Sequence, residues 1–168
     1  MQLLLTSHLV LAAISQIGTT KFDTNCTSVD KYFSIRPLHS SLVLDATDDL
    51  NITLQPFVNS DPQLWRLLPS EKLGTFYINS KVHPRAFLAS VAVMVGNYPV
   101  DVRAAIFSTD HPVSWFINSD GTIVMLTTFD ENALDVPNSD YSVNNQVQLR
   151  NRDEKEYFEN KKFVLDPR

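Results

Sequence analysis

The sequence predicts an all-β domain built from three similar repeats, and three observations support this prediction. Short apolar segments alternate with polar turns, and no segment shows a 3.6-residue apolar period over three turns. The stretch Ser41–Pro69 holds two strand signals, a polar loop and the triplet Gln63-Leu64-Trp65. A similar arrangement recurs twice downstream at a spacing near 45 residues.

The repeats occupy residues 32–69, 74–119 and 121–168. Each repeat is expected to begin with a strand and to continue with a second and a third strand before an aromatic residue. The expected strands are 32–37, 42–44 and 52–57 in the first repeat, 75–79, 87–90 and 100–107 in the second, and 122–126, 133–136 and 146–149 in the third.

Two sets of positions carry the repeat register. The residues that end the second strand are 44 and 46 residues apart, and they are Asp45, Ala89 and Asp135. The aromatic residues that close each repeat are 50 and 43 residues apart, and they are Trp65, Trp115 and Phe158. Three blades are too few to close a propeller, so the count favours a threefold barrel capped by three hairpins. The predicted fold class is therefore a β-trefoil.

Composition and charge exclude several classes of function. The chain has 168 residues, a net charge of −5 and no clustered basic stripe, which argues against a nucleic-acid partner. No phosphate-binding loop, hydrolase elbow or metal-ligand motif occurs, and only four glycines are available to build one. The sequence therefore predicts a protein that is not an enzyme and that has neither a cofactor nor a metal.

The first twenty residues differ from the rest. Residues 1–20 carry an apolar run and no charge before Lys21, and the run is too short to span a membrane. The pattern favours a secretory signal peptide on residues 1–20, followed by a single domain over 21–168; a buried first strand or helix is the alternative. The protein is expected to be secreted and, with sequons at Asn25 and Asn51, to be a glycoprotein.

Cys26 is the only cysteine, so no disulfide can form within the chain. In a secreted protein such a thiol either stays buried or pairs with another chain. A dimer joined through Cys26 is therefore one of the alternatives.

The first repeat resembles the ricin B-type (Q-x-W) β-trefoil lectins. The resemblance rests on Leu44-Asp45-Ala46, on Leu54-Gln55-Pro56 and on Asp61-Pro62-Gln63-Leu64-Trp65. The second repeat keeps only the Trp, in Val113-Ser114-Trp115, and the third only an aromatic residue, in Glu156-Tyr157-Phe158. The resemblance implies a β-trefoil in which the aromatic residues are core anchors, and a carbohydrate-binding function.

The resemblance also implies a sugar site in each repeat that keeps an Asp after its second strand. That position is Asp45 in the first repeat and Asp135 in the third, whereas Ala89 makes a site in the second improbable. The slot for an aromatic platform falls near Gln55 and near Arg150, neither of which is aromatic. The main site is expected in the first repeat, with Asp135 as a second site. The candidate carbohydrate-binding residues are Asp45, Gln55, Asn59, Gln63 and Asp135.

Three functions remain open. The first is a secreted lectin-like protein that binds glycans or glycoproteins. The second is a trefoil inhibitor of proteases, for which residues 91–101 are the best candidate for a long exposed loop. The third is a secreted effector or interaction protein without a sugar site. The fold alone does not decide between them.

Overall fold

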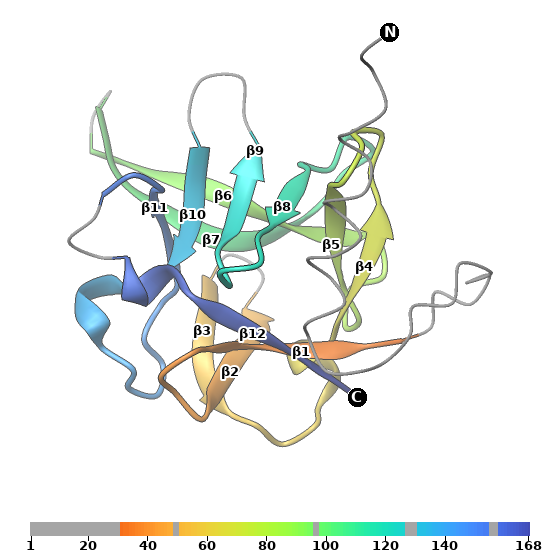
Figure 1. Cartoon of the computed structure of the whole chain (residues 1–168), viewed down its shortest axis with the longest axis horizontal. Helices are drawn as coiled ribbons and strands as arrows, with labels where there is room; N and C mark the ends of the chain where they lie inside the picture. Colours follow the sequence, from red (N-terminus) through yellow and green to blue (C-terminus); the bar gives the residue numbers. More distant parts are fainter. Residues whose placement is uncertain (1–30, 49–50, 96–97, 127–130, 155–157) are drawn as a thin grey trace, which may run out of the picture.

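The computed structural model describes residues 31–48, 51–95, 98–126, 131–154 and 158–168. Figure 1 shows a rounded β structure in which the first and last strands lie side by side. The described residues form twelve strands: β1 (Phe33–Pro37), β2 (Leu42–Asp48), β3 (Asn51–Pro56), β4 (Trp65–Pro69), β5 (Phe76–Ser80), β6 (Ala86–Val95), β7 (Tyr98–Ser108), β8 (Trp115–Ile117), β9 (Ile123–Leu126), β10 (Glu131–Asp135), β11 (Gln148–Asn151) and β12 (Phe163–Pro167).

Six of these strands form a barrel. All pairs are antiparallel, and they follow the order β12, β1, β4, β5, β8 and β9. The ring closes through an isolated bridge between Thr122 and Lys162, which precede β9 and β12. Each of the three repeats therefore contributes its first and fourth strands to the barrel.

The other six strands form three hairpins that cap the barrel: β2 with β3, β6 with β7, and β10 with β11. The three hairpins are joined to one another at the third strand of each repeat. The Val147 amide donates to the Ile52 carbonyl at 2.8 Å, and the Ala104 amide donates to the Val147 carbonyl at 3.0 Å. A barrel with three such hairpins is a β-trefoil, so the predicted fold class is confirmed.

The core lies inside the barrel and beneath the hairpins. Trp65 and Trp115 are its largest members, and both are fully buried at the first residue of β4 and of β8. The Trp115 indole donates to the Leu88 carbonyl at 2.9 Å. Both tryptophans are therefore core anchors, as the resemblance implied.

The predicted anchor of the third repeat is wrong. Phe158 is 38% exposed, whereas Phe163 is buried and is the first residue of β12, as Trp65 is of β4. A short 3-10 helix precedes both strands: η1 (Asp61–Gln63) before β4 and η4 (Glu159–Lys161) before β12. The third triplet is therefore Lys161-Lys162-Phe163, five residues after the predicted one, and its first residue is the last residue of η4.

The segment proposed as a long inhibitory loop is also different from the prediction. Most of it consists of paired strand, with Val93 opposite Asp101 and Val95 opposite Tyr98. The high β propensity of its valines explains the pairing. The predicted leader, the sequon at Asn25 and Cys26 lie outside the described residues.

Candidate functional site

The same three positions in each hairpin are candidates for ligand binding. One is the residue after the buried Leu44, Leu88 or Leu134; another faces it across the hairpin; the third lies two residues further along the third strand. The resulting triads are Asp45, Thr53 and Gln55 in the first repeat, Ala89, Ala105 and Phe107 in the second, and Asp135, Gln148 and Arg150 in the third.

In the third repeat Asp135 is almost fully enclosed, with 1% of its surface exposed. Its Oδ2 atom accepts a hydrogen bond from Gln148 Nε2 at 2.7 Å and lies 3.4 Å from Arg150 Nε. Its Oδ1 atom is buried and has no hydrogen-bond partner among the described residues. A buried oxygen without a donor costs about 1–3 kcal/mol, so this atom is a strong acceptor for any hydroxyl that reaches it.

Burial raises the pKa of Asp135 above its ordinary value, against the opposing effects of the Gln148 hydrogen bond and of the positive charges of Arg150 and Lys161. The same burial lowers the pKa of Lys161, while the nearby Asp135 charge raises it. The two groups therefore form part of one electrostatic cluster behind the third hairpin.

Lys161 occupies the position that Gln63 has in the first repeat, at the end of the short helix. It is fully buried, and its Nζ donates to the carbonyls of Asn151 at 2.6 Å and Glu154 at 2.9 Å, with a longer contact to that of Arg152. This ammonium holds the loop after β11 in place beside Asp135.

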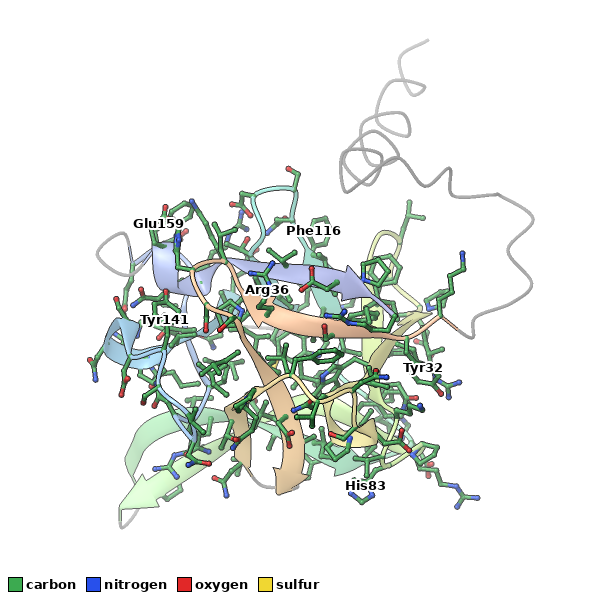
Figure 2. All side chains as sticks on the ribbon, turned by 90° about the horizontal axis from the view of Figure 1, so that it is seen from below. Tyr32, Arg36, His83, Phe116, Tyr141 and Glu159 are labelled. Carbon is green, nitrogen blue, oxygen red and sulfur yellow. The ribbon has the colours of Figure 1, made fainter. Side chains whose placement is uncertain are left out.

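Tyr141 lies in the loop between β10 and β11, where it packs against the core. Burial raises the pKa of its hydroxyl, and so do the negative charges of Asp135 and Glu159. Figure 2 shows Tyr141 and Glu159 on the same side of the molecule, opposite Tyr32 and His83. The third repeat thus has an aromatic residue near its carboxylate, supplied by a loop and not by the third strand.

In the first repeat Asp45 is also buried, with 5% of its surface exposed, and it faces Thr53. Gln55 Nε2 donates to Thr53 Oγ1 at 3.2 Å and to Asn144 Oδ1 at 2.7 Å, which ties the hairpin to the third repeat. Asn59 is exposed and has a left-handed backbone with φ of 56°.

Gln63 is buried and holds the backbone of its own loop. Its Oε1 accepts from the Val58 amide at 2.8 Å, and its Nε2 donates to the Pro56 carbonyl at 2.8 Å. Both ends of the amide are therefore engaged within the protein. The structure brings Asp45 and Gln55 onto one hairpin, and it places Asp135 in a separate site.

The second repeat replaces the carboxylate with an apolar surface. Phe107 occupies the slot in which an aromatic platform was expected near Gln55 and Arg150, and it is 36% exposed. It faces Phe87, whose ring meets Tyr77 edge to face at 6.0 Å. The aromatic residue on the third strand and the carboxylate on the second strand are thus found in different repeats. With the correct strand register, the sequence alone would have placed Phe107 in the platform slot.

Solved structures show which known proteins share this arrangement. A designed threefold symmetric protein, ThreeFoil, matches with a TM-score of 0.62 and 20% identity over 80% of this chain and 97% of its own. The Macrolepiota procera ricin B-like lectin in complex with lactose matches with a TM-score of 0.62 and 17% identity over 83% and 96%. The C-half of the earthworm R-type lectin in complex with GalNAc matches with a TM-score of 0.58 and 19% identity over 82% and 99%.

The fold is that of the ricin B-type lectins. At these identities the likeness shows the fold and not the function. No protein-family model matches the chain, and no curated protein matches it. The β-trefoil is nonetheless a fold that carbohydrate-binding proteins use.

The part of the chain that the structure describes has neither a cluster of metal-binding side chains nor a membrane-spanning helix. No group of three or more His, Cys, Asp or Glu side chains in this part of the chain is arranged to hold a metal ion. No helix among these residues is long and apolar enough to cross a membrane.

Proposed function

We propose that this protein is a secreted carbohydrate-binding protein and that its main sugar site surrounds Asp135. The observation that carries the proposal is the buried Oδ1 atom of Asp135, which has no donor among the described residues. A sugar hydroxyl is a donor of the right kind, and a hydrogen bond to a charged acceptor is roughly twice as strong as a neutral one.

The neighbours of Asp135 suit a sugar ring. Gln148 holds one carboxylate oxygen at 2.7 Å and so orients the other. Arg150 lies in the platform slot, where its planar guanidinium offers both a stacking surface and donors. Arg150 Nε lies 3.4 Å from Asp135 Oδ2 and its Nη1 lies 3.5 Å from Glu154 Oε2, so a ligand that moves this side chain must replace both ion pairs.

The first repeat provides the second site in this proposal. Asp45 has the equivalent place, but Gln55 is already bonded to Asn144 and Gln63 to its own loop. Fewer polar atoms are therefore left to contact a ligand than the sequence predicted. The lactose and GalNAc complexes of proteins with this fold add support for a carbohydrate ligand.

Affinity at a single site should be low, because neither carboxylate has an aromatic residue on the third strand beside it. A millimolar dissociation constant corresponds to about 4 kcal/mol. Two sites on one chain would raise the affinity for a multivalent glycan.

The test is a glycan array probed with the exported, mature protein, followed by titration of the best ligand against three variants. N-terminal sequencing of the same material checks the predicted loss of the leader. Asp135→Asn should weaken binding at least tenfold and Asp45→Asn less. Asp153→Asn, an exposed residue of the same repeat, should leave binding unchanged.

Two results would contradict the proposal. One is the absence of any glycan that binds on the array. The other is a folded Asp135→Asn variant that binds the ligand as tightly as the unmodified chain. The first would favour an interaction protein without a sugar site, and the second would place the sugar site away from Asp135.

A further inference from the structure

The β6–β7 hairpin is the longest of the three. Its strands have 10 and 11 residues, against 7 and 6 in β2 and β3 and 5 and 4 in β10 and β11. Its pairing runs from Ala86 opposite Ser108 to Val95 opposite Tyr98. In Figure 1 the hairpin extends to one side of the molecule, past the body of the barrel.

The outer half of this hairpin is a two-stranded ribbon. β6 pairs with β5 at Asn79 and Phe87, near the base, and β7 pairs with β11 at Gln148 and Arg103, midway along the hairpin. Among the described residues no strand pairs with Ser90–Val95 on the side away from β7. The backbone amides and carbonyls along this edge of β6 are therefore available to another strand.

The two edges of the ribbon differ in their protection. The outer part of β7 includes Pro99, which lacks an amide hydrogen, and the acidic residue Asp101 in its sequence. The outer part of β6 reads Ser-Val-Ala-Val-Met-Val, with no charge and no proline. Ala92 and Met94 are exposed, and Met94 has 51% of its surface in solvent. A six-residue segment of this composition favours strand pairing with another chain.

The chemistry of the edge identifies what pairs with it. A lipid bilayer does not satisfy open backbone groups, so an unpaired strand edge does not enter hydrocarbon. The net charge of −5 also opposes attraction to an anionic membrane surface. An uncharged strand that meets an identical strand brings no like charges together, and two copies related by a twofold axis pair antiparallel.

We propose that β6 pairs antiparallel with β6 of a second copy of this chain, so that the two hairpins form a four-stranded sheet. Contact along six residues buries less surface than the roughly 1,200 Å² typical of a stable complex, so the dimer should dissociate on dilution. The proposal is independent of sugar binding and of Cys26.

Sedimentation velocity tests the proposal on a Cys26→Ser chain, which removes any disulfide dimer. The sedimentation coefficient should rise from the monomer value toward the dimer value between about 1 and 200 µM protein, as mass action requires. Ala92→Lys places a charge on the open edge and should weaken dimerisation at least tenfold. Leu73→Lys introduces the same charge at an exposed leucine in the turn before β5 and should have no effect.

Cross-linking locates the interface. In the Cys26→Ser chain, Ala92→Cys should form an intermolecular disulfide under mild oxidation, and Leu73→Cys should not. A chain that stays monomeric throughout the concentration range, or a dimer that Ala92→Lys leaves intact, would overturn the proposal. A monomer that binds phosphatidylcholine vesicles through this hairpin would overturn it in favour of a lipid partner.

Discussion

At three equivalent positions the chain carries Asp45, Ala89 and Asp135, and the neighbours of each residue decide what it can do. Asp135 has an oxygen without a partner among the described residues, and its other oxygen faces Arg150 at 3.4 Å. On the same hairpin as Asp45, the side-chain amide of Gln55 is already bonded to Asn144 of the third repeat. Three residues in the same place therefore give three different surfaces.

Because the pKa of Asp135 is raised, we expect this residue to make the stability of the folded protein depend on pH. Because burial raises the pKa in the folded protein, the folded state binds the proton more tightly than the unfolded state. The resulting stabilisation is fully present below the unfolded pKa and is lost as the pH rises through the raised pKa. Asp135→Asn removes this titration, so relative to the unmodified chain the variant should gain stability as the pH rises from about 3 to 7.

Urea unfolding of both chains across this pH range measures the difference. Asp153→Asn is the control, because this side chain is exposed in the same repeat. A stability difference between Asp135→Asn and the unmodified chain that stays constant with pH would contradict the prediction.

The short helix and the strand that follows it form one structural element in the first and third repeats. In each, the last helical residue is buried and holds the neighbouring loop, through an amide in Gln63 and an ammonium in Lys161. Two residues later the first residue of the strand enters the core, as Trp65 and Phe163. One end of this element thus holds a loop and the other end packs in the core. Both repeats keep the helix and the strand although their residues differ.

This element predicts unequal effects of removing two phenylalanines from the third repeat. Phe163→Ala leaves a cavity in the core and should lower the free energy of unfolding by about 3–5 kcal/mol, as should Trp65→Ala. Phe158→Ala removes a partly exposed ring that packs under the Lys162 ammonium at 4.5 Å, and it should cost about 1 kcal/mol or less.

Chemical denaturation of the three variants measures these values. Equal losses for the two phenylalanine variants would show that Phe158, and not Phe163 alone, anchors the third repeat.

The whole molecule depends on the contact between its first and last strands. β12 pairs with β1 from Phe33 opposite Pro167 to Pro37 opposite Phe163, and Arg36 forms an ion pair with Asp166 at 2.9 Å. No tight turn joins these two strands, since β1 and β12 belong to the first and last repeats. Barrel closure is therefore a long-range event that completes the core.

Removal of the last six residues tests this closure. A chain that ends at Lys162 loses β12, which leaves β1 with an open edge and exposes one side of the core, so it should lose cooperative thermal unfolding. A chain that ends at Asp166 keeps Ile35 opposite Leu165 and should remain folded. Circular dichroism melting of both chains decides the point. A cooperative transition in the shorter chain would show that the barrel does not require β12.

Several features of the fold were predictable from local patterns. The threefold repeat, the first three strands of each repeat and the core positions of Trp65 and Trp115 follow from alternation and from the spacing of matching residues. The third anchor was missed although the fourth strands share a pattern, Trp65-Arg-Leu-Leu-Pro69 and Phe163-Val-Leu-Asp-Pro167. The repeat register also indicated that Asp45 and Asp135 take equivalent positions after a buried leucine, but not that both side chains are buried.

The sequence by itself determined that the chain is all-β, that it repeats three times, and which face of each hairpin is buried. These properties depend on the period of two along a strand and on the spacing between repeats, both of which are local. Only the tertiary structure decided that Asp135 is enclosed with an unpartnered oxygen, that Gln55 is bonded to Asn144, and that Phe107 takes the platform slot. Each of these depends on which distant strands meet and in which register, since burial and hydrogen-bond partners are set by neighbours far apart in the chain.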